Sequence, residues 1–118
     1  MKPQKPRAQF RLRISSGDDI AVGPGKIDLL EAIGATGSIT AAARSLGMSY
    51  RRAWLLVDTM NHCFRNAVVE AETGGVRGGG TRLTATGERV VQLYRRVDAK
   101  ALAAGATDLK ALQKLLRN

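Results

Sequence analysis

Apolar residues in the middle of the chain recur at the spacing of two short helices joined by a tight turn. The first predicted helix follows Ser38, a residue type that caps helix N-termini, and Gly47 is suited to end it. Met48 then places an apolar side chain in the turn, and Ser49 can cap a second helix. The expected buried face of the first helix comprises Ile39, Ala42, Ala43 and Leu46.

The second predicted helix buries one side and carries cations near its start. Its expected apolar stripe consists of Ala53, Trp54, Val57, Met60 and Phe64. The residues left on or near the opposite face are Tyr50, Arg51, Arg52, Leu55, Asp58 and Thr59. In a helix-turn-helix, the N-terminal residues of the second helix contact base edges, so this pattern indicates DNA binding.

Several side chains of this second helix have two interpretations. Arg51 and Arg52 diverge as helical neighbours, so we expect one to contact a base and the other a phosphate, and the alternative is an ordinary solvated surface. Tyr50 either bonds a phosphate or packs beside the turn. Trp54 is expected in the core. Leu55 either contacts a thymine methyl group or packs against the following hairpin, and we expect the second.

Two β-hairpins are predicted on either side of this helical pair. Residues 10–15 alternate apolar and polar, 16–19 supply turn residues and 20–22 form a return strand, after which 26–36 form a helix. Residues 67–72 and 81–84 are again extended, and the glycine-rich segment between them makes a second hairpin that resembles a wing. Arg77 at its tip and Arg82 at its exit provide positive charge for a phosphate surface.

The last third of the chain predicts a long helix with an apolar stripe. Thr84 or Thr86 can cap it, Gly105 interrupts it, and a further short helix follows. So small a domain leaves much of this stripe uncovered, which favours contact with a second copy of the chain, whereas a helix folded back on its own domain is the alternative. The expected dimerisation residues are Val90, Leu93, Tyr94, Val97, Ala101, Leu109, Leu112 and Leu116.

Composition favours one basic domain. The chain has 118 residues, 44% of them hydrophobic and 4% aromatic, and a formal net charge of +9. That charge favours a polyanionic partner, with double-stranded DNA as the leading candidate. Anionic membranes attract the same charge, but no apolar run is long enough to span a bilayer, and no membrane partner is expected. The start shows no signal-peptide pattern, so we expect a cytoplasmic, nucleoid-associated protein.

The residue types present do not predict an enzyme. His62 and Cys63 are adjacent, but neighbours on a helix point about 100° apart and do not form a base and nucleophile pair. One histidine and one cysteine also make no metal site, and Cys63 excludes an intramolecular disulfide. The loop GGVRGGGT lacks the lysine and position of a nucleotide-binding loop. We therefore expect no enzyme activity, no metal and no cofactor.

The fold expected from these elements is mainly α with small β-hairpins, an α+β class. Residues 1–8 form a flexible basic arm, which either adds phosphate contacts or is a solvated tail. Residues 9–85 form a winged helix-turn-helix DNA-binding domain that includes the N-terminal hairpin. Residues 86–118 supply the long C-terminal dimerisation helix or helices.

Three segments carry a resemblance to a known family: SYRRAW at 49–54, MN at 60–61 and VEAETGGVRGGGTRLTATGERVVQLY at 69–94. They resemble the N-terminal DNA-binding domain of the molybdate-responsive ModE regulators, a winged helix related to the LysR type. The resemblance runs from about residue 26 to residue 94. It implies a homodimer, formed through the long C-terminal helix, on a pseudo-palindromic operator. It also implies that Thr40, Ser49, Tyr50, Arg51 and Arg52 face DNA and that Arg77 and Arg82 lie on the wing.

The chain departs from the ModE pattern at its end. Full-length members of that family carry molybdate-binding domains after this point, whereas this sequence ends at Asn118. We therefore expect no molybdate binding from this chain. Three alternatives stay open: the regulator responds to something else, it binds DNA without an effector, or it is a small standalone member of the family.

Two functions of different classes follow from the sequence. The first is a sequence-specific transcriptional regulator with one recognition helix in each major-groove half-site. The second is an architectural protein that coats DNA by charge with little sequence preference. The expected DNA-contacting residues are Ser38, Thr40, Arg44, Ser49, Tyr50, Arg51, Arg52, Thr59, Arg77 and Arg82.

Overall fold

The computed structural model describes residues 5–72 and 80–117, and over these residues the fold is mainly helical with two small hairpins. The N-terminal elements are β1 (Ile14–Ser16), β2 (Asp19–Val22), α1 (Pro24–Thr36), α2 (Ile39–Ser45) and α3 (Tyr50–Cys63). The C-terminal elements are β3 (Val69–Glu72), β4 (Gly80–Leu83), α4 (Ala85–Ala104) and α5 (Ala106–Lys114). The expected α+β class is confirmed.

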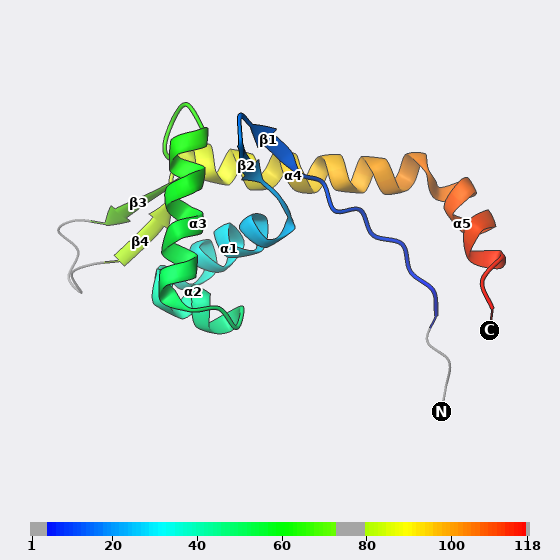
Figure 1. Cartoon of the computed structure of the whole chain (residues 1–118), viewed down its shortest axis with the longest axis horizontal. Helices are drawn as coiled ribbons and strands as arrows, with labels where there is room; N and C mark the ends of the chain where they lie inside the picture. Colours follow the sequence, from blue (N-terminus) through cyan, green and yellow to red (C-terminus); the bar gives the residue numbers. More distant parts are fainter. Residues whose placement is uncertain (1–4, 73–79, 118) are drawn as a thin grey trace.

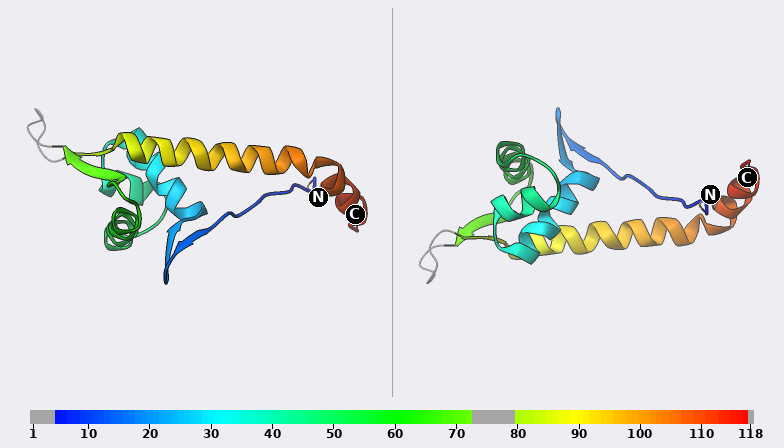
Figure 2. Two further views of the ribbon diagram at one scale, coloured as in Figure 1. Left: turned by 90° about the horizontal axis from the view of Figure 1, so that it is seen from above. Right: turned by 90° about the horizontal axis from the view of Figure 1, so that it is seen from below.

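Helix α4 is the long axis of the molecule. Helices α1, α2 and α3 and the β3–β4 hairpin gather around its N-terminal half, while its C-terminal half extends away from them and carries α5 (Figures 1 and 2). The molecule measures 56 Å along its longest axis and 24 Å along its shortest. None of the helices in the described ranges is long and apolar enough to cross a membrane.

Helix α1 lies at the centre of the core. Its side chains Ile27, Leu29, Leu30 and Ile33 are fully buried. They belong to one apolar cluster with the buried residues of α2 and α3. Val68, directly before β3, Val69, the first residue of β3, and Tyr94 of α4 are in the same cluster. Because every neighbouring element contributes to this single cluster, α1 fixes the relative positions of α3 and the β3–β4 hairpin.

The α2–turn–α3 segment forms as the sequence predicts. The Ser38 hydroxyl accepts a hydrogen bond from the Ala41 amide at 3.1 Å, and the Ser49 hydroxyl accepts one from the Arg52 amide at 3.1 Å. Gly47 adopts a φ of 68°, the left-handed conformation that ends α2. The prediction that Leu46 is buried was wrong, because this side chain lies at the turn and is exposed.

The N-terminal hairpin is shorter than the alternating pattern of residues 10–15 predicts. Strand β1 covers three residues and pairs antiparallel with β2, with an irregularity between Ile14 and Ser15. Strand β2 ends at Val22, directly before Gly23 and the start of α1. In the described structure, residues 10–13 therefore have no strand to pair with, and they continue as irregular chain.

The second hairpin follows the prediction. Strands β3 and β4 pair antiparallel in the register Val69 to Leu83 and Glu72 to Gly80. The amide of Thr81 donates to the carbonyl of Gly37 at 3.0 Å, which joins the hairpin to the end of α1. Residues 73–79, including Arg77, lie outside the described residues.

Helix α4 begins in close contact with the backbone before β3. Thr84, rather than Thr86, is its cap, and the Thr84 hydroxyl accepts from the Gly87 amide at 3.0 Å. Gly87 is buried, and a Cβ atom there would overlap the carbonyl oxygen of Val68 and lie 3.0 Å from its carbonyl carbon. Glycine at this position thus permits the close approach of α4 to the β3–β4 hairpin.

An ion-pair cluster joins α1 to α4 on the surface. Arg95 donates through Nε to Glu31 at 3.1 Å and through Nη2 to Asp28 at 3.1 Å, and a further bond joins Nη2 to Glu31. Hydrogen bonding to Glu31 raises the pKa of Arg95 above its ordinary value. Because the partners are about half exposed, this cluster adds modestly to stability.

Candidate nucleic-acid interface

The N-terminal end of α3 projects two arginines from the body of the molecule. Arg51 and Arg52 are exposed, and neither forms an ion pair with any other described residue. No acidic residue lies in the first turn of α3. A helix N-terminus carries partial positive charge. Two cations there add to that charge, so the N-terminus of α3 favours a bound anion.

Three of the hydroxyl residues predicted to contact DNA form hydrogen bonds within the chain. Ser38 and Ser49 accept hydrogen bonds from α2 and α3 amides as caps, and Thr59 donates to the carbonyl of Leu55 at 3.0 Å. Thr40 and Arg44 are exposed on α2. The structure thus places Ser38 and Ser49 at the two helix starts, and the cations nearby supply the charge of this surface.

Trp54 does not lie in the core, contrary to the prediction. Its side chain is 47% exposed, whereas Ala53, Val57 and Met60 form the buried side of α3. Ala53 is fully buried where α3 meets the core, and a small residue suits that close approach. Trp54, about 100° further around the helix, falls at the margin of the packed face.

Leu55, predicted from the sequence to pack against the following hairpin, is exposed in the described structure. The structure leaves it 48% exposed on α3, and it is absent from the residues that line the space between α3 and the β3–β4 hairpin. Tyr50 is 55% exposed and does line that space. Leu55 therefore lies on the outer surface of α3, away from the described strands of the hairpin, and residues 73–79 of the hairpin lie outside the described residues.

An open groove of about 290 Å³ separates α3 from the β3–β4 hairpin. Tyr50, Trp54 and Asn61 line it from α3, and Ala71 and Thr81 line it from the strands. Two carboxylates, Asp58 and Glu70, also contribute to the lining. The described lining of the groove therefore includes both aromatic and acidic side chains, and Arg51 and Arg52, in the first turn of α3, are not among its described lining residues.

Asn61 connects α3 to β3, a role that the sequence did not indicate. Its Oδ1 accepts from the amides of Val68 at 2.8 Å and Val69 at 3.2 Å, and its Nδ2 donates to the carbonyl of Val69 at 3.1 Å. In the sequence, Asn61 belongs to the MN segment of the family resemblance and is an amide side chain at the end of an amphipathic helix, shortly before a strand. These bonds hold the hairpin beside α3.

Arg82 on β4 forms an ion pair with Glu70, its neighbour across the hairpin. Its Nε donates to Glu70 Oε1 at 2.8 Å, and its Nη2 lies 2.6 Å from the same oxygen. Both side chains are about half exposed. A phosphate contact by Arg82 would compete with this pair, so Arg82 is a weaker candidate for DNA contact than the arginines of α3.

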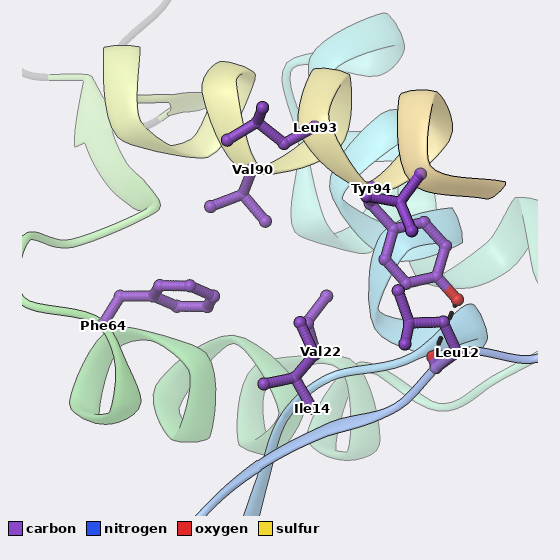
Figure 3. A pocket seen from close by; sticks show the side chains of 8 residues that line it. Leu12, Ile14, Val22, Phe64, Val90, Leu93 and Tyr94 are labelled. Atoms are coloured by element: carbon purple, nitrogen blue, oxygen red, sulfur yellow. Dashed lines mark hydrogen bonds between the residues drawn. The ribbon is translucent and has the colours of Figure 1, made fainter. Parts of the chain in front are cut away.

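A second surface lies along α4 and is apolar. Leu93 and Val97 are 41% and 50% exposed and border a cavity of about 160 Å³ between α4 and the N-terminal hairpin. Figure 3 shows Leu12, Ile14 and Phe64 on the other walls of this cavity. The described residues that line this cavity present an apolar surface to it, which distinguishes it from the groove beside α3.

The predicted dimerisation residues differ in their exposure to solvent. Tyr94 is buried in its own chain, and its hydroxyl donates to the carbonyl of Leu12 at 2.9 Å (Figure 3). It therefore supports the N-terminal segment. Val90, Ala101 and Leu109 are half-buried. Leu93, Val97, Leu112 and Leu116 are exposed, and they are the members of the set that remain free to meet a partner.

The chain is similar to several curated proteins over most of its length. It is 35% identical over 123 residues to the molybdenum transport protein ModE of Azotobacter vinelandii, which covers 93% of this chain and 46% of that protein. It is 46% identical over 78 residues to the molybdenum-pterin-binding protein MopB of Rhodobacter capsulatus, covering 66% of this chain and 29% of MopB. It is 38% identical over 88 residues to the DNA-binding transcriptional dual regulator ModE of Escherichia coli K12, covering 75% of this chain and 34% of that protein.

No family model matches the chain. The chain spans less than half the length of each of these three relatives. Their names describe transport, pterin binding and transcriptional regulation by proteins much longer than the matched segment. The chain is therefore related to the ModE and Mop proteins through a segment that makes up a minority of each of them.

Proposed function

We propose that the protein is a sequence-specific, DNA-binding transcriptional regulator of the ModE type. In this proposal α2 and α3 form a helix-turn-helix, α3 is the recognition helix and the β3–β4 hairpin is the wing. The observation that carries the proposal is the exposed first turn of α3, where Arg51 and Arg52 lack ion-pair partners among the described residues. Similarity to the E. coli ModE regulator supports it.

The proposed contacts follow from the placement of each side chain. Arg51 and Arg52 diverge on the helix, so one contacts a base edge in the major groove while the other binds a phosphate. Arg44 and Thr40, exposed on α2, lie toward the DNA backbone. Tyr50 bonds a phosphate or lies along a sugar at the edge of the groove. Arg77 remains a proposed wing contact outside the described residues.

The proposed active form is a homodimer. The exposed apolar residues Leu93 and Val97 lie one turn apart on α4, and Leu112 on α5 and Leu116 just beyond α5 are exposed apolar residues as well. A second copy that covers these residues removes them from water and supplies a second recognition helix. Two such helices meet successive major grooves when they lie about 34–36 Å apart, and the matching operator is a pseudo-palindrome.

Molybdenum chemistry is not part of this proposal. The names MopB and molybdenum transport protein belong to relatives of which this chain spans 29% and 46%. The matched segments make up a minority of those proteins, so their ligands are not assigned to this chain.

Selection of bound duplexes from a random pool tests the proposal. We expect wild-type protein to enrich a pseudo-palindromic motif, and Arg51→Ala or Arg52→Ala to relax base preference at one position of each half-site. Lys110→Ala on α5 is the matched control, because it also removes one cation but lies beyond the C-terminal end of α4, far from the proposed DNA face. A pool that shows no enriched motif would support the architectural alternative, in which charge alone binds DNA.

A further inference from the structure

Trp54 is a large apolar side chain that the fold leaves in water. It is 47% exposed, and Tyr50 and Leu55, one turn away and adjacent, are exposed to a similar degree. An aromatic side chain buries about 150–250 Å² in a core or interface, so an exposed tryptophan beside a tyrosine and a leucine leaves a large apolar area unused. A contiguous exposed apolar patch usually marks an interaction surface.

The surroundings of this patch favour a polyanion that also presents apolar groups. Arg51 and Arg52 flank it on the same two turns of α3, without ion-pair partners among the residues described. The groove that Trp54 borders contains Asp58 and Glu70, whose carboxylates repel phosphate from its interior. Phosphates therefore suit the arginine side of the patch, and uncharged base edges suit the Trp54 side.

Duplex DNA provides this combination in its major groove. Phosphates border the groove, and each thymine places a C5-methyl group on its floor, where apolar side chains make contact. Residues 51 and 54 are separated by three positions on α3, so their side chains lie on neighbouring parts of one face. An arginine that contacts one base edge thus brings the indole to the next one or two base pairs.

We propose that Trp54 determines specificity by packing its indole against a thymine methyl group beside the base that Arg51 or Arg52 contacts. This inference rests on the proposed DNA-binding function. It assigns to Trp54 a direct contact with the base rather than a structural role in α3.

Removal of single methyl groups from the selected duplex tests this contact. Each thymine of a half-site is replaced in turn by deoxyuridine, and binding is measured for wild type and Trp54→Ala. We expect one replacement to weaken wild-type binding about fourfold, the effect of losing one buried methyl-sized group. The same replacement should leave Trp54→Ala binding unchanged. Leu115→Ala, at an exposed leucine beyond the end of α5, is the matched control and should keep the wild-type sensitivity.

Fluorescence of the protein provides an independent test, because Trp54 is its single tryptophan. We expect the selected duplex to shift the emission to shorter wavelength and to reduce acrylamide quenching, with a smaller effect for a scrambled duplex of equal length. Quenching should not change with protein concentration in the absence of DNA. Protection that appears on self-association alone would overturn the inference and identify Trp54 as a protein contact.

The outcomes separate this inference from the proposed function. If wild type enriches no motif, the regulator proposal fails. If wild type enriches a motif, but Trp54→Ala enriches the same motif with the same deoxyuridine sensitivity, the regulator proposal stands and the role of Trp54 is wrong. If Trp54→Ala fails to fold, as judged by its thermal unfolding, the wild-type fluorescence measurement still decides: an indole that stays accessible to acrylamide in the saturated specific complex overturns the inference.

Discussion

The side-chain amide of Asn61 forms a reciprocal hydrogen-bonded pair with the backbone of Val69. Oδ1 accepts from the Val69 amide at 3.2 Å, and Nδ2 donates to the Val69 carbonyl at 3.1 Å. The side-chain amide thereby bonds to the edge of β3 as a neighbouring strand would. Asn61 Oδ1 also accepts a third hydrogen bond, from the amide of Val68. Helix α3 and the hairpin are held together by this one side chain in addition to the core.

Replacement of Asn61 by alanine should loosen the hairpin from α3. The amides of Val68 and Val69 would lose their acceptor, and an unsatisfied buried amide costs about 1–3 kcal/mol. We expect the free energy of unfolding, measured by urea titration, to fall by about that amount. Asn66→Ala is the control, since Asn66 is exposed and should change stability by less than about 0.5 kcal/mol. Equal effects of the two changes would contradict the assigned role of Asn61.

Glycine should be required at position 87 and dispensable at position 25. A methyl group at Gly87 would overlap the Val68 carbonyl, so Gly87→Ala must push α4 away and should cost about 1–3 kcal/mol. Among the described residues, no atom lies within 4 Å of a Cβ built at Gly25 in α1. Gly25→Ala should therefore be neutral or stabilise the protein by up to about 1 kcal/mol. Thermal unfolding of the two variants distinguishes the positions, and a wild-type melting temperature for Gly87→Ala would refute the close approach.

Tyr94 should make stability depend on pH in the alkaline range. Burial, followed by the nearby Asp98 carboxylate, raises the pKa of the Tyr94 phenol above its ordinary value of 10.0. The folded state then holds the proton more tightly than the unfolded state. This contribution is fully present below pH 10.0 and is lost as the pH rises through the folded-state pKa.

Tyr94→Phe tests this dependence. It removes the bond to Leu12, at a cost of about 1 kcal/mol near neutral pH, and should flatten the decline of unfolding free energy above pH 10.0. Tyr50→Phe, at an exposed position, is the control and should keep the wild-type decline. Identical alkaline profiles for wild type and Tyr94→Phe would show that this phenol does not contribute.

Glu70→Gln should strengthen DNA binding without changing base preference. The Glu70 carboxylate neutralises Arg82 across the hairpin, and its removal frees the guanidinium for phosphate. We expect tighter binding to all duplexes and a salt dependence steeper by up to about one unit. Asp108→Asn on α5 changes the net charge equally at a distance from the proposed DNA face. If both variants alter the salt dependence alike, Arg82 acts only through the overall charge.

Local signals in the sequence predicted most of the fold. The caps Ser38, Ser49 and Thr84 and the turn at Gly47 depend on residues within a few positions, so the pattern of the sequence contains them. Strand β1 was predicted too long because its length depends on its partner, which ends where α1 begins.

The candidate site was less predictable because it depends on tertiary packing. By periodicity, Ala53 and Trp54 are both compatible with the buried side of α3. Because α3 lies close to the core, the small Ala53 is buried there and Trp54 is exposed. The partners of Asn61 and Arg82 lie on other elements, at separations of up to 12 residues, so their bonds could not be predicted from local pattern. The dimer and the DNA contacts stay predictions.

The specificity ratio at physiological salt tests the central claim most directly. Binding is measured by fluorescence anisotropy for the duplex recovered by selection and for a scrambled duplex of the same length and composition, each carrying the fluorophore. A sequence-specific regulator should bind the first at least about a thousandfold more tightly. A ratio near one, with both affinities falling equally as salt rises, would contradict the account and show that charge alone attaches this protein to DNA.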